Sequence, residues 1–164
     1  QPLTLIAGPC QLESKDHAYE MCGALKQLTQ KLGMQFIYKT SYDKANRTSL
    51  FVKRGVGIDK GLQILADIRK DFGVPVLTDV HSEDQCKSVG EVVDVLQIPA
   101  FLCRQTDLLV AAAKTNKVIS VKKGQFVSAE AMQFAVDKIK DAGNPKVWLT
   151  ERGNSFGYKP FTDR

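Results

Sequence analysis

Six short apolar runs recur along the chain, and each is followed by polar residues and then by a segment with helical periodicity. The runs cover residues 3–10, 34–40, 74–81, 92–99, 117–123 and 146–152. Apolar residues occupy both alternating faces in most of these runs, which is typical of parallel strands covered on both sides. The pattern therefore predicts six strands of one parallel sheet.

Between these runs, apolar residues recur at spacings of three and four, as one face of a helix requires. Helix-capping residues then place the ends of the predicted helices. The five helices are expected between Ser14 and Gly33, from Ile58 to a stop at Gly73, after Ser82, over about residues 105–116, and between Ser128 and Gly143. Ser82 and Gln85, three residues apart, also resemble a capping box.

Strands that alternate with helices of this length predict βαβ units and an α/β fold. Two architectures are compatible with them, an open doubly wound sheet and a TIM (β/α)8 barrel. Every run ends in polar or reactive side chains: Cys10, Lys39, Ser41, Asp79, His81, Gln97, Lys122, Glu151 and Arg152. A barrel gathers strand ends at one face, whereas a doubly wound sheet binds ligands near one switch point. The spread over six strands favours a barrel, with 1–164 as a single domain of about six β/α units.

Composition and charge narrow the classes of partner. The 164 residues are 43% hydrophobic and 25% charged, and a net charge of +5 with a pI of about 9.0 favours anionic partners. Nucleic acid is not expected, because basic residues alternate with acidic ones and no basic stripe with interleaved aromatics occurs. With no apolar run of membrane-spanning length and no signal segment, we expect a cytoplasmic protein that binds no membrane, with four reduced cysteines.

The segment KTSYDKANR, residues 39–47, concentrates unlike charges directly after the second run. Taken singly, each strand-end residue also has an ordinary structural role, such as a solvated lysine or a buried cysteine. Asp79 and His81 could cap the next helix or pair with each other. Cations that converge on one barrel mouth would repel one another unless anions bind there. Their coincidence at the strand ends predicts an anion-binding site.

Seven motifs run through nearly all of the chain: AGPCQLES (7–14), KTSYDKANRTS (39–49), RGVG (54–57), TDVH (78–81), DVLQIPAFLCRQTDL (94–108), VKKGQFVS (121–128) and ERGNSFGY (151–158). Their order and spacing resemble the 3-deoxy-D-manno-octulosonate 8-phosphate synthase family, aldolase-type barrels that use phosphoenolpyruvate. The resemblance implies a transferase that condenses phosphoenolpyruvate with D-arabinose 5-phosphate and releases phosphate. In Gram-negative bacteria the product feeds lipopolysaccharide (KDO) biosynthesis, and in plants a pectin.

By the same resemblance, Lys44, Lys122, Gln97 and Arg152 would hold phosphoenolpyruvate through its phosphate and carboxylate. Asp79 would join Lys44 and Lys122 as a catalytic residue that orients the lysines. Arginine suits bidentate recognition of such groups, while lysine acts as a point charge.

A second set of residues would bind the sugar phosphate. The resemblance assigns it to Lys39, Asn46 and Arg47, and makes Ser41 a further substrate-binding residue. It also implies a homotetramer in which Arg104 reaches the sugar phosphate of a neighbouring subunit. Related 3-deoxy-D-arabino-heptulosonate 7-phosphate synthases take erythrose 4-phosphate and usually carry Lys-Pro-Arg-Thr where this chain has KANR. Asn46 therefore favours the five-carbon sugar, with the four-carbon sugar as an alternative.

Cys10 in the first motif resembles the metal-dependent class of this family. It implies a divalent metal ion, with iron, zinc, manganese and cobalt all open as its identity. The other metal ligands of the family, a His, a Glu and an Asp, have no matching positions here. Six predicted strands instead of eight imply that the C-terminal strands of the family are missing. A non-catalytic binder of sugar phosphates is therefore a further alternative.

Overall fold

A computed structural model describes residues 3–45, 49–51, 53 and 55–155. Within them lies one parallel sheet in the order β1-β2-β3-β4-β5-β6. The strands are β1 (Thr4–Ala7), β2 (Gln35–Lys39), β3 (Val76–Asp79), β4 (Val95–Ile98), β5 (Val118–Lys122) and β6 (Val147–Thr150). Each strand pairs with the next one along the chain, which confirms the predicted βαβ units.

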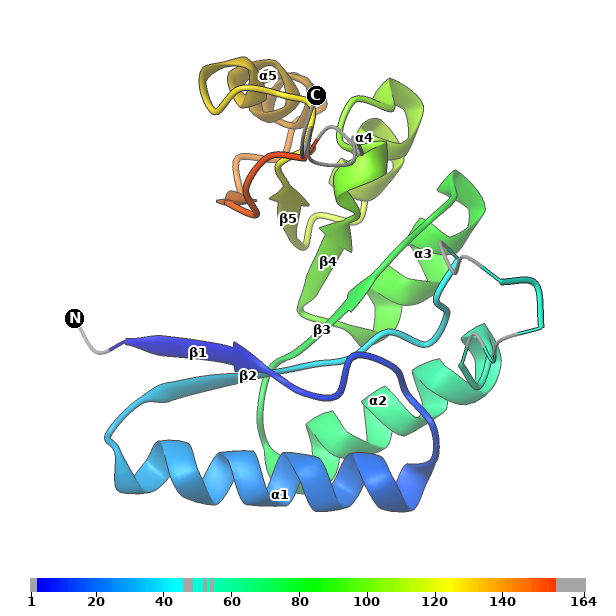
Figure 1. Cartoon of the computed structure of the whole chain (residues 1–164), viewed down its shortest axis with the longest axis vertical. Helices are drawn as coiled ribbons and strands as arrows, with labels where there is room; N and C mark the ends of the chain where they lie inside the picture. The colour runs from blue at the N-terminus through cyan, green and yellow to red at the C-terminus, as the bar shows by residue number, and fades with distance from the viewer. Residues whose placement is uncertain (1–2, 46–48, 52, 54, 156–164) are drawn as a thin grey trace, which may run out of the picture.

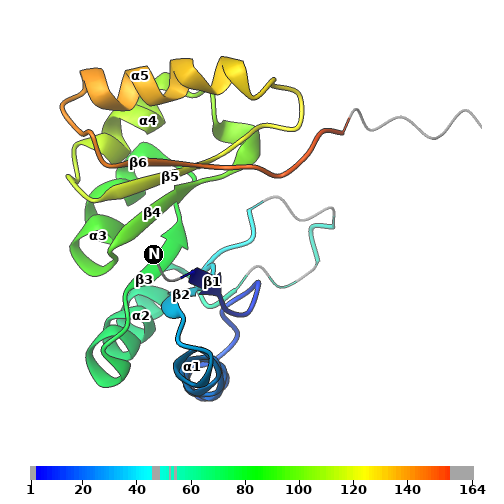
Figure 2. The ribbon, with the colours of Figure 1, turned by 90° about the vertical axis from the view of Figure 1, so that its left-hand side faces the viewer.

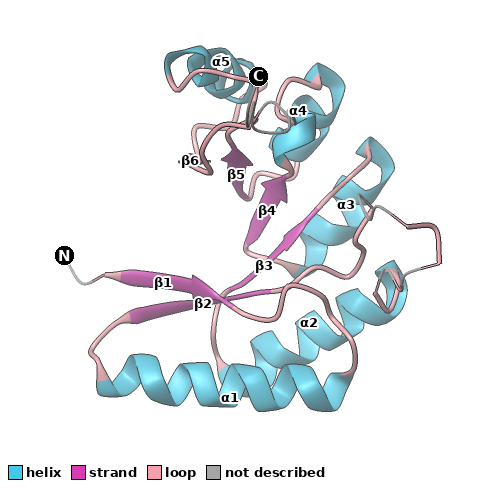
Figure 3. Ribbon diagram, viewed as in Figure 1, coloured by secondary structure: helices cyan, strands magenta, loops and turns pink. Residues whose placement is uncertain are grey.

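Five helices connect these strands. They are α1 (Lys15–Lys31), α2 (Ile58–Phe72), α3 (Glu83–Val92), α4 (Thr106–Ala113) and α5 (Gln133–Asp141), with short 3-10 turns at Ala100–Leu102 and Glu130–Met132. The strands follow a curved arc and the helices cover its convex side (Figures 1 and 3). Among the described residues the arc stays open between β1 and β6. The molecule is thus a curled half-barrel, which confirms the TIM-barrel class.

Most predicted helix ends are confirmed. The Ser14 hydroxyl accepts a hydrogen bond from His17 N at 3.2 Å, and Gly73 ends α2 in the left-handed region with φ 63°. The capping box at Ser82 was wrong, because no side-chain capping bond forms there. Gln85 Oε1 instead accepts from His81 N at 2.8 Å and from the hydroxyl of Tyr42 at 2.9 Å. The Gln85 oxygen thus bonds to the backbone one residue before Ser82 and to a distant tyrosine.

Two apolar layers hold the sheet. The larger one lies between the sheet and the helices and contains Tyr38, Leu65, Leu96 and Ile119, all fully buried. The smaller one lines the inner face and consists of Ile37, Leu77 and Val95, packed with Val118. Side chains alternate along a strand, so residues an even number of positions further on share this inner face.

That alternation places the polar site. Lys39 lies two residues after Ile37, Asp79 two after Leu77, Gln97 two after Val95, and Lys122 four after Val118. These four side chains therefore sit above the inner apolar layer, at the carboxyl ends of their strands. Figure 2 shows the segments after β2 and β6 leaving the sheet on the same side.

Two glycines permit close approaches beside this edge. A Cβ on Gly8 would lie 1.9 Å from the carbonyl oxygen of Lys39, so only glycine allows the end of β1 to meet β2 there. A Cβ on Gly61 of α2 would lie 2.4 Å from the Cβ of Tyr42. Both glycines thus fix backbone that leads into the site. Among the described helices, none has the length and apolar character needed to cross a bilayer.

Candidate active site

A cavity of about 560 Å³ opens at the carboxyl ends of the strands. Its wall includes residues from every β/α unit present. They are Cys10, Lys39, Ser41, Asp43, Lys44, Ala45, Asp79, His81, Gln97, Pro99, Ala100, Phe101, Leu102, Lys122, Gln125 and Arg152. Eight of the eleven residues singled out from the sequence thus meet at one place. Asn46 and Arg47 lie outside the described residues.

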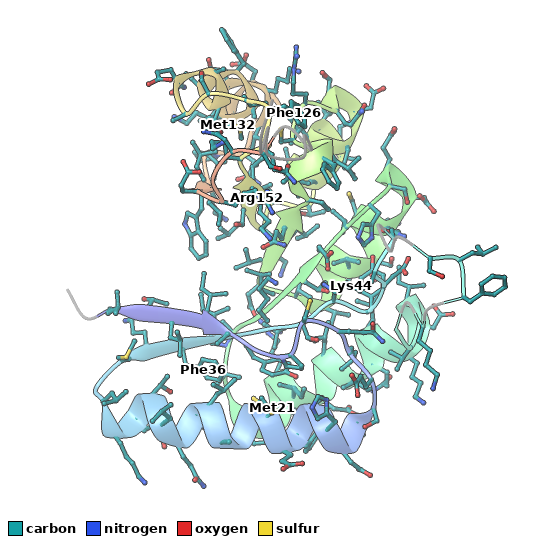
Figure 4. The ribbon with its side chains drawn as sticks, in the orientation of Figure 1. Met21, Phe36, Lys44, Phe126, Met132 and Arg152 are labelled. Atoms are coloured by element: carbon teal, nitrogen blue, oxygen red, sulfur yellow. The ribbon has the colours of Figure 1, made fainter. Side chains whose placement is uncertain are left out.

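The segment after β2 enters the cavity through Ser41 and Lys44. Lys44 Nζ donates to Ser41 Oγ at 2.7 Å. Between them, the ring of Tyr42 is buried and its hydroxyl donates to Gln85 Oε1. This anchor on the helical side leaves the neighbouring Ser41 and Lys44 facing the cavity. Figure 4 labels Lys44 on this segment and Arg152 on the segment after β6.

Asp79, which is buried, and His81, which is partly buried, form a pair at the end of β3. His81 Nε2 lies 3.2 Å from Asp79 Oδ2, so pairing rather than helix capping is the observed arrangement. Burial tends to raise the pKa of Asp79, but hydrogen bonds from His81 and Ser41 and the charge of Lys44 outweigh it and lower the pKa. Within the described residues, Asp79 Oδ1 and His81 Nδ1 are buried without a hydrogen-bond partner. Their hydrogen-bonding capacity is therefore unused among the described residues.

Crowded cations give the cavity its electrostatic character. Burial lowers the pKa of Lys39, and the charges of Lys122 and Lys44 lower it further against the opposing effect of Asp79. The lowered pKa means that this surrounding destabilises the charged form of Lys39. An anion bound in the cavity would stabilise the charged form again.

The far wall comes from β4, β5 and the segment after β6. Gln97 is buried at the end of β4, Lys122 is half-buried at the end of β5, and Arg152 is exposed. Gln125 and the 99–102 turn also line the cavity and were missed by the sequence reasoning. They lie within the motifs DVLQIPAFLCRQTDL (94–108) and VKKGQFVS (121–128), but their apolar or amide side chains suggested no role. Only the fold brings them to the site.

Among the described candidates, Arg104 lies elsewhere. It lines a separate hollow with Phe126, Met132, Phe134 and Lys138, beside α5. Phe126 and Phe134 are exposed there. Arg104 is therefore not positioned to touch a ligand in the cavity of its own chain.

Cys10 is exposed and lines the cavity. In the part of the chain that the structure describes, no group of three or more His, Cys, Asp and Glu side chains could hold a metal ion. Cys10 therefore does not by itself make a metal centre. The charged groups that the described site presents are its lysines, Arg152 and the carboxylates of Asp43 and Asp79, the latter paired with His81.

A barrel face that gathers cations at the ends of β2, β5 and β6 defines a (β/α) barrel protein with a cationic mouth. The model of the DAHP synthetase I family matches residues 1–163, and the chain belongs to this family. A 2-dehydro-3-deoxyphosphooctonate aldolase of Chelativorans sp. (strain BNC1) is 66% identical over 157 residues. Proteins of the same name from Bartonella quintana (strain Toulouse) and Brucella anthropi are 62% and 60% identical. The matches cover 96% of this chain and 56–57% of the relatives, so the chain spans just over half their length.

Proposed function

We propose that the chain serves the condensation of phosphoenolpyruvate with D-arabinose 5-phosphate and water to 3-deoxy-D-manno-octulosonate 8-phosphate and phosphate. The relatives that are 60–66% identical are named for the product of this reaction. Such a reaction joins the methylene carbon of phosphoenolpyruvate to the aldehyde carbon of the sugar. Water adds at the enol carbon, and the phosphate leaves from the same carbon.

The observation that carries the proposal is the charge of the cavity wall. Lys39, Lys44, Lys122 and Arg152 supply four cations, against the two carboxylates of Asp43 and Asp79. Two phosphates and a carboxylate need such an excess of positive charge. A volume of about 560 Å³ lies in the range of small-molecule sites.

Within this proposal, Lys44, Lys122, Gln97 and Arg152 hold phosphoenolpyruvate. Lys44 and Lys122 neutralise charge that builds up on the leaving phosphate, because their ammonium groups reach the cavity from β2 and β5. Asp79 keeps His81 and the lysines oriented through its hydrogen bonds and charge.

Lys39 and Ser41 hold the sugar phosphate, together with Asn46 and Arg47. The position of Arg104 outside the cavity agrees with a role toward a neighbouring subunit of a homotetramer. A cytoplasmic location and a divalent metal ion (iron, zinc, manganese or cobalt) at Cys10 belong to the same proposal. Such a metal would need donors besides the Cys10 thiolate, and the roles above do not depend on it.

The test is phosphate release from phosphoenolpyruvate, measured with arabinose 5-phosphate and separately with erythrose 4-phosphate. Release with the five-carbon sugar alone is expected. Lys122→Met should lower kcat/KM by about ten- to hundredfold, the effect of losing a hydrogen bond to a charged group. Lys140→Met, at an exposed position of α5, should leave the rate unchanged.

Other outcomes would contradict the proposal in different ways. Release with erythrose 4-phosphate alone would assign the heptulosonate reaction. Calorimetric binding of phosphoenolpyruvate without release would indicate a non-catalytic binder. Full activity of Lys122→Met would remove the cation cluster from the mechanism.

A further inference from the structure

The lysine next to Lys122 lies in an unusual environment. Lys123 is only 5% exposed, whereas Lys122 faces the cavity. Side chains alternate along a strand, so the two neighbours point to opposite sides. Lys123 N donates to Thr150 O at 2.9 Å, which continues the pairing of β5 with β6. The ammonium group of Lys123 is thus carried behind the cavity wall.

Four oxygens surround this buried ammonium group. Lys123 Nζ lies 3.0 Å from Gly124 O, 3.0 Å from Val127 O, 2.9 Å from Gly153 O and 2.8 Å from Asn154 Oδ1. Two of the oxygens belong to the segment after β5, and the other two to the segment after β6. An ammonium group has three protons, so this shell uses its full donor capacity.

The carboxylate of Glu151 also links Lys123 to the segment after β6. Glu151 Oε1 accepts from Arg152 N at 2.8 Å and from Gly153 N at 2.7 Å, and it lies 3.8 Å from Lys123 Nζ. Ser155 N also donates to Gln125 O at 3.3 Å. Bonds on both sides of Arg152 therefore tie its backbone to the segment after β5.

A buried lysine is commonly only a stabilising element, since a buried charge needs its hydrogen bonds. Here the two tied segments both contribute to the cavity, through Gln125 on one side and Arg152 on the other. We propose that Lys123 is a positioning residue, which holds Arg152 at the cavity wall for the anionic ligand. The inference rests on the proposed function, because it takes phosphoenolpyruvate as that ligand.

Calorimetric affinity for phosphoenolpyruvate, measured in a double-mutant cycle, tests the inference. Lys123→Met keeps the length of the side chain and removes its charge. If the untied segment holds Arg152 in place about one tenth of the time, affinity falls about tenfold. In an Arg152→Met background the same change should cost less than about twofold, because it acts through Arg152.

Lys39→Met, on the opposite wall, provides the matched background. There Lys123→Met should keep its full effect of about tenfold, because Lys39 and Arg152 are carried by separate elements. A merely destabilising role of Lys123 would lower affinity equally in both backgrounds. Equal losses would therefore overturn the inference while leaving the proposed function intact. No binding of phosphoenolpyruvate by the unaltered chain would overturn both.

Two further measurements keep the inference testable if Lys123→Met folds poorly. Asn154→Ala removes one acceptor from an exposed position and should weaken binding by about threefold, again only when Arg152 is present. Amide hydrogen exchange at Arg152 and Gly153 should become faster in either variant, while the amide of Val121 within β5 stays protected. Unchanged exchange at Arg152 and Gly153 would show that Lys123 does not hold the segment after β6 in place.

Discussion

Replacing Asp79 with asparagine tests the electrostatic balance of the site. The residue is 8% exposed, and its Oδ2 lies 3.2 Å from His81 Nε2. Asparagine keeps the shape and one acceptor oxygen but removes the negative charge. The variant therefore weakens the hydrogen bonds from His81 and Ser41 and leaves Lys39 and Lys44 without their counter-charge.

The expected loss of stability follows from these contacts. A hydrogen bond to a charged group contributes about 1.5–3 kcal/mol, and two such bonds are weakened rather than removed. We expect Asp79→Asn to lower the free energy of unfolding by about 2–3 kcal/mol at pH 7. For a chain of this size, that loss corresponds to a fall in Tm of roughly 5–10 °C.

The pH dependence has a definite sign. The pKa of Asp79 is lower in the folded protein than its ordinary value, so the folded state binds fewer protons than the unfolded state. The stabilisation from its charge is complete above about pH 4 and is lost as the pH falls through the folded pKa. The part of the difference that comes from the Asp79 charge should shrink below about pH 4.

Urea unfolding at a series of pH values measures this difference. Asp141→Asn, at an exposed position at the end of α5, is the control and should change stability by less than about 0.5 kcal/mol. Equal stability of Asp79→Asn and the unaltered protein at pH 7 would refute the reasoning. A difference that grows as the pH falls below about 4 would also refute it, because it would mean a raised pKa of Asp79.

Two further predictions concern packing and thiol reactivity. Gly61→Ala should destabilise the fold by about 1–3 kcal/mol in urea unfolding, because its Cβ would lie 2.4 Å from that of Tyr42. Gly23→Ala, whose Cβ would make only ordinary contacts, should be neutral or stabilising, and an equal loss in both would contradict the steric argument. Iodoacetamide at pH 8 should label exposed Cys10 well before Cys22, because burial raises the pKa of the Cys22 thiol to about 11. Peptide mass mapping gives the order of labelling, and earlier labelling of Cys22 would contradict it.

The sequence predicted secondary structure well where neighbouring residues determine it. Apolar runs and capping residues predicted six strands and five helices, and Ser14 and Gly73 bound their helices as expected. The capping box of Ser82 was wrong: the Ser82 side chain makes no capping bond, and Gln85 bonds to His81 N and to the distant Tyr42 hydroxyl, a partner that no local pattern reveals. Tertiary hydrogen bonds can replace local ones at little cost, so such motifs are weaker predictors than periodicity.

The sequence by itself determined which residues stand at strand ends, because the length and the apolar alternation of a strand depend on neighbouring residues. Lys39, Asp79 and Lys122 were therefore recognisable as members of one barrel face. Only the tertiary structure decided that Lys123 turns away from the cavity and bonds to the segment of Arg152 from behind. Two adjacent lysines look the same in sequence. Which of them points inward depends on the pairing of β5 with its neighbours, and on oxygens that lie some thirty residues away along the chain.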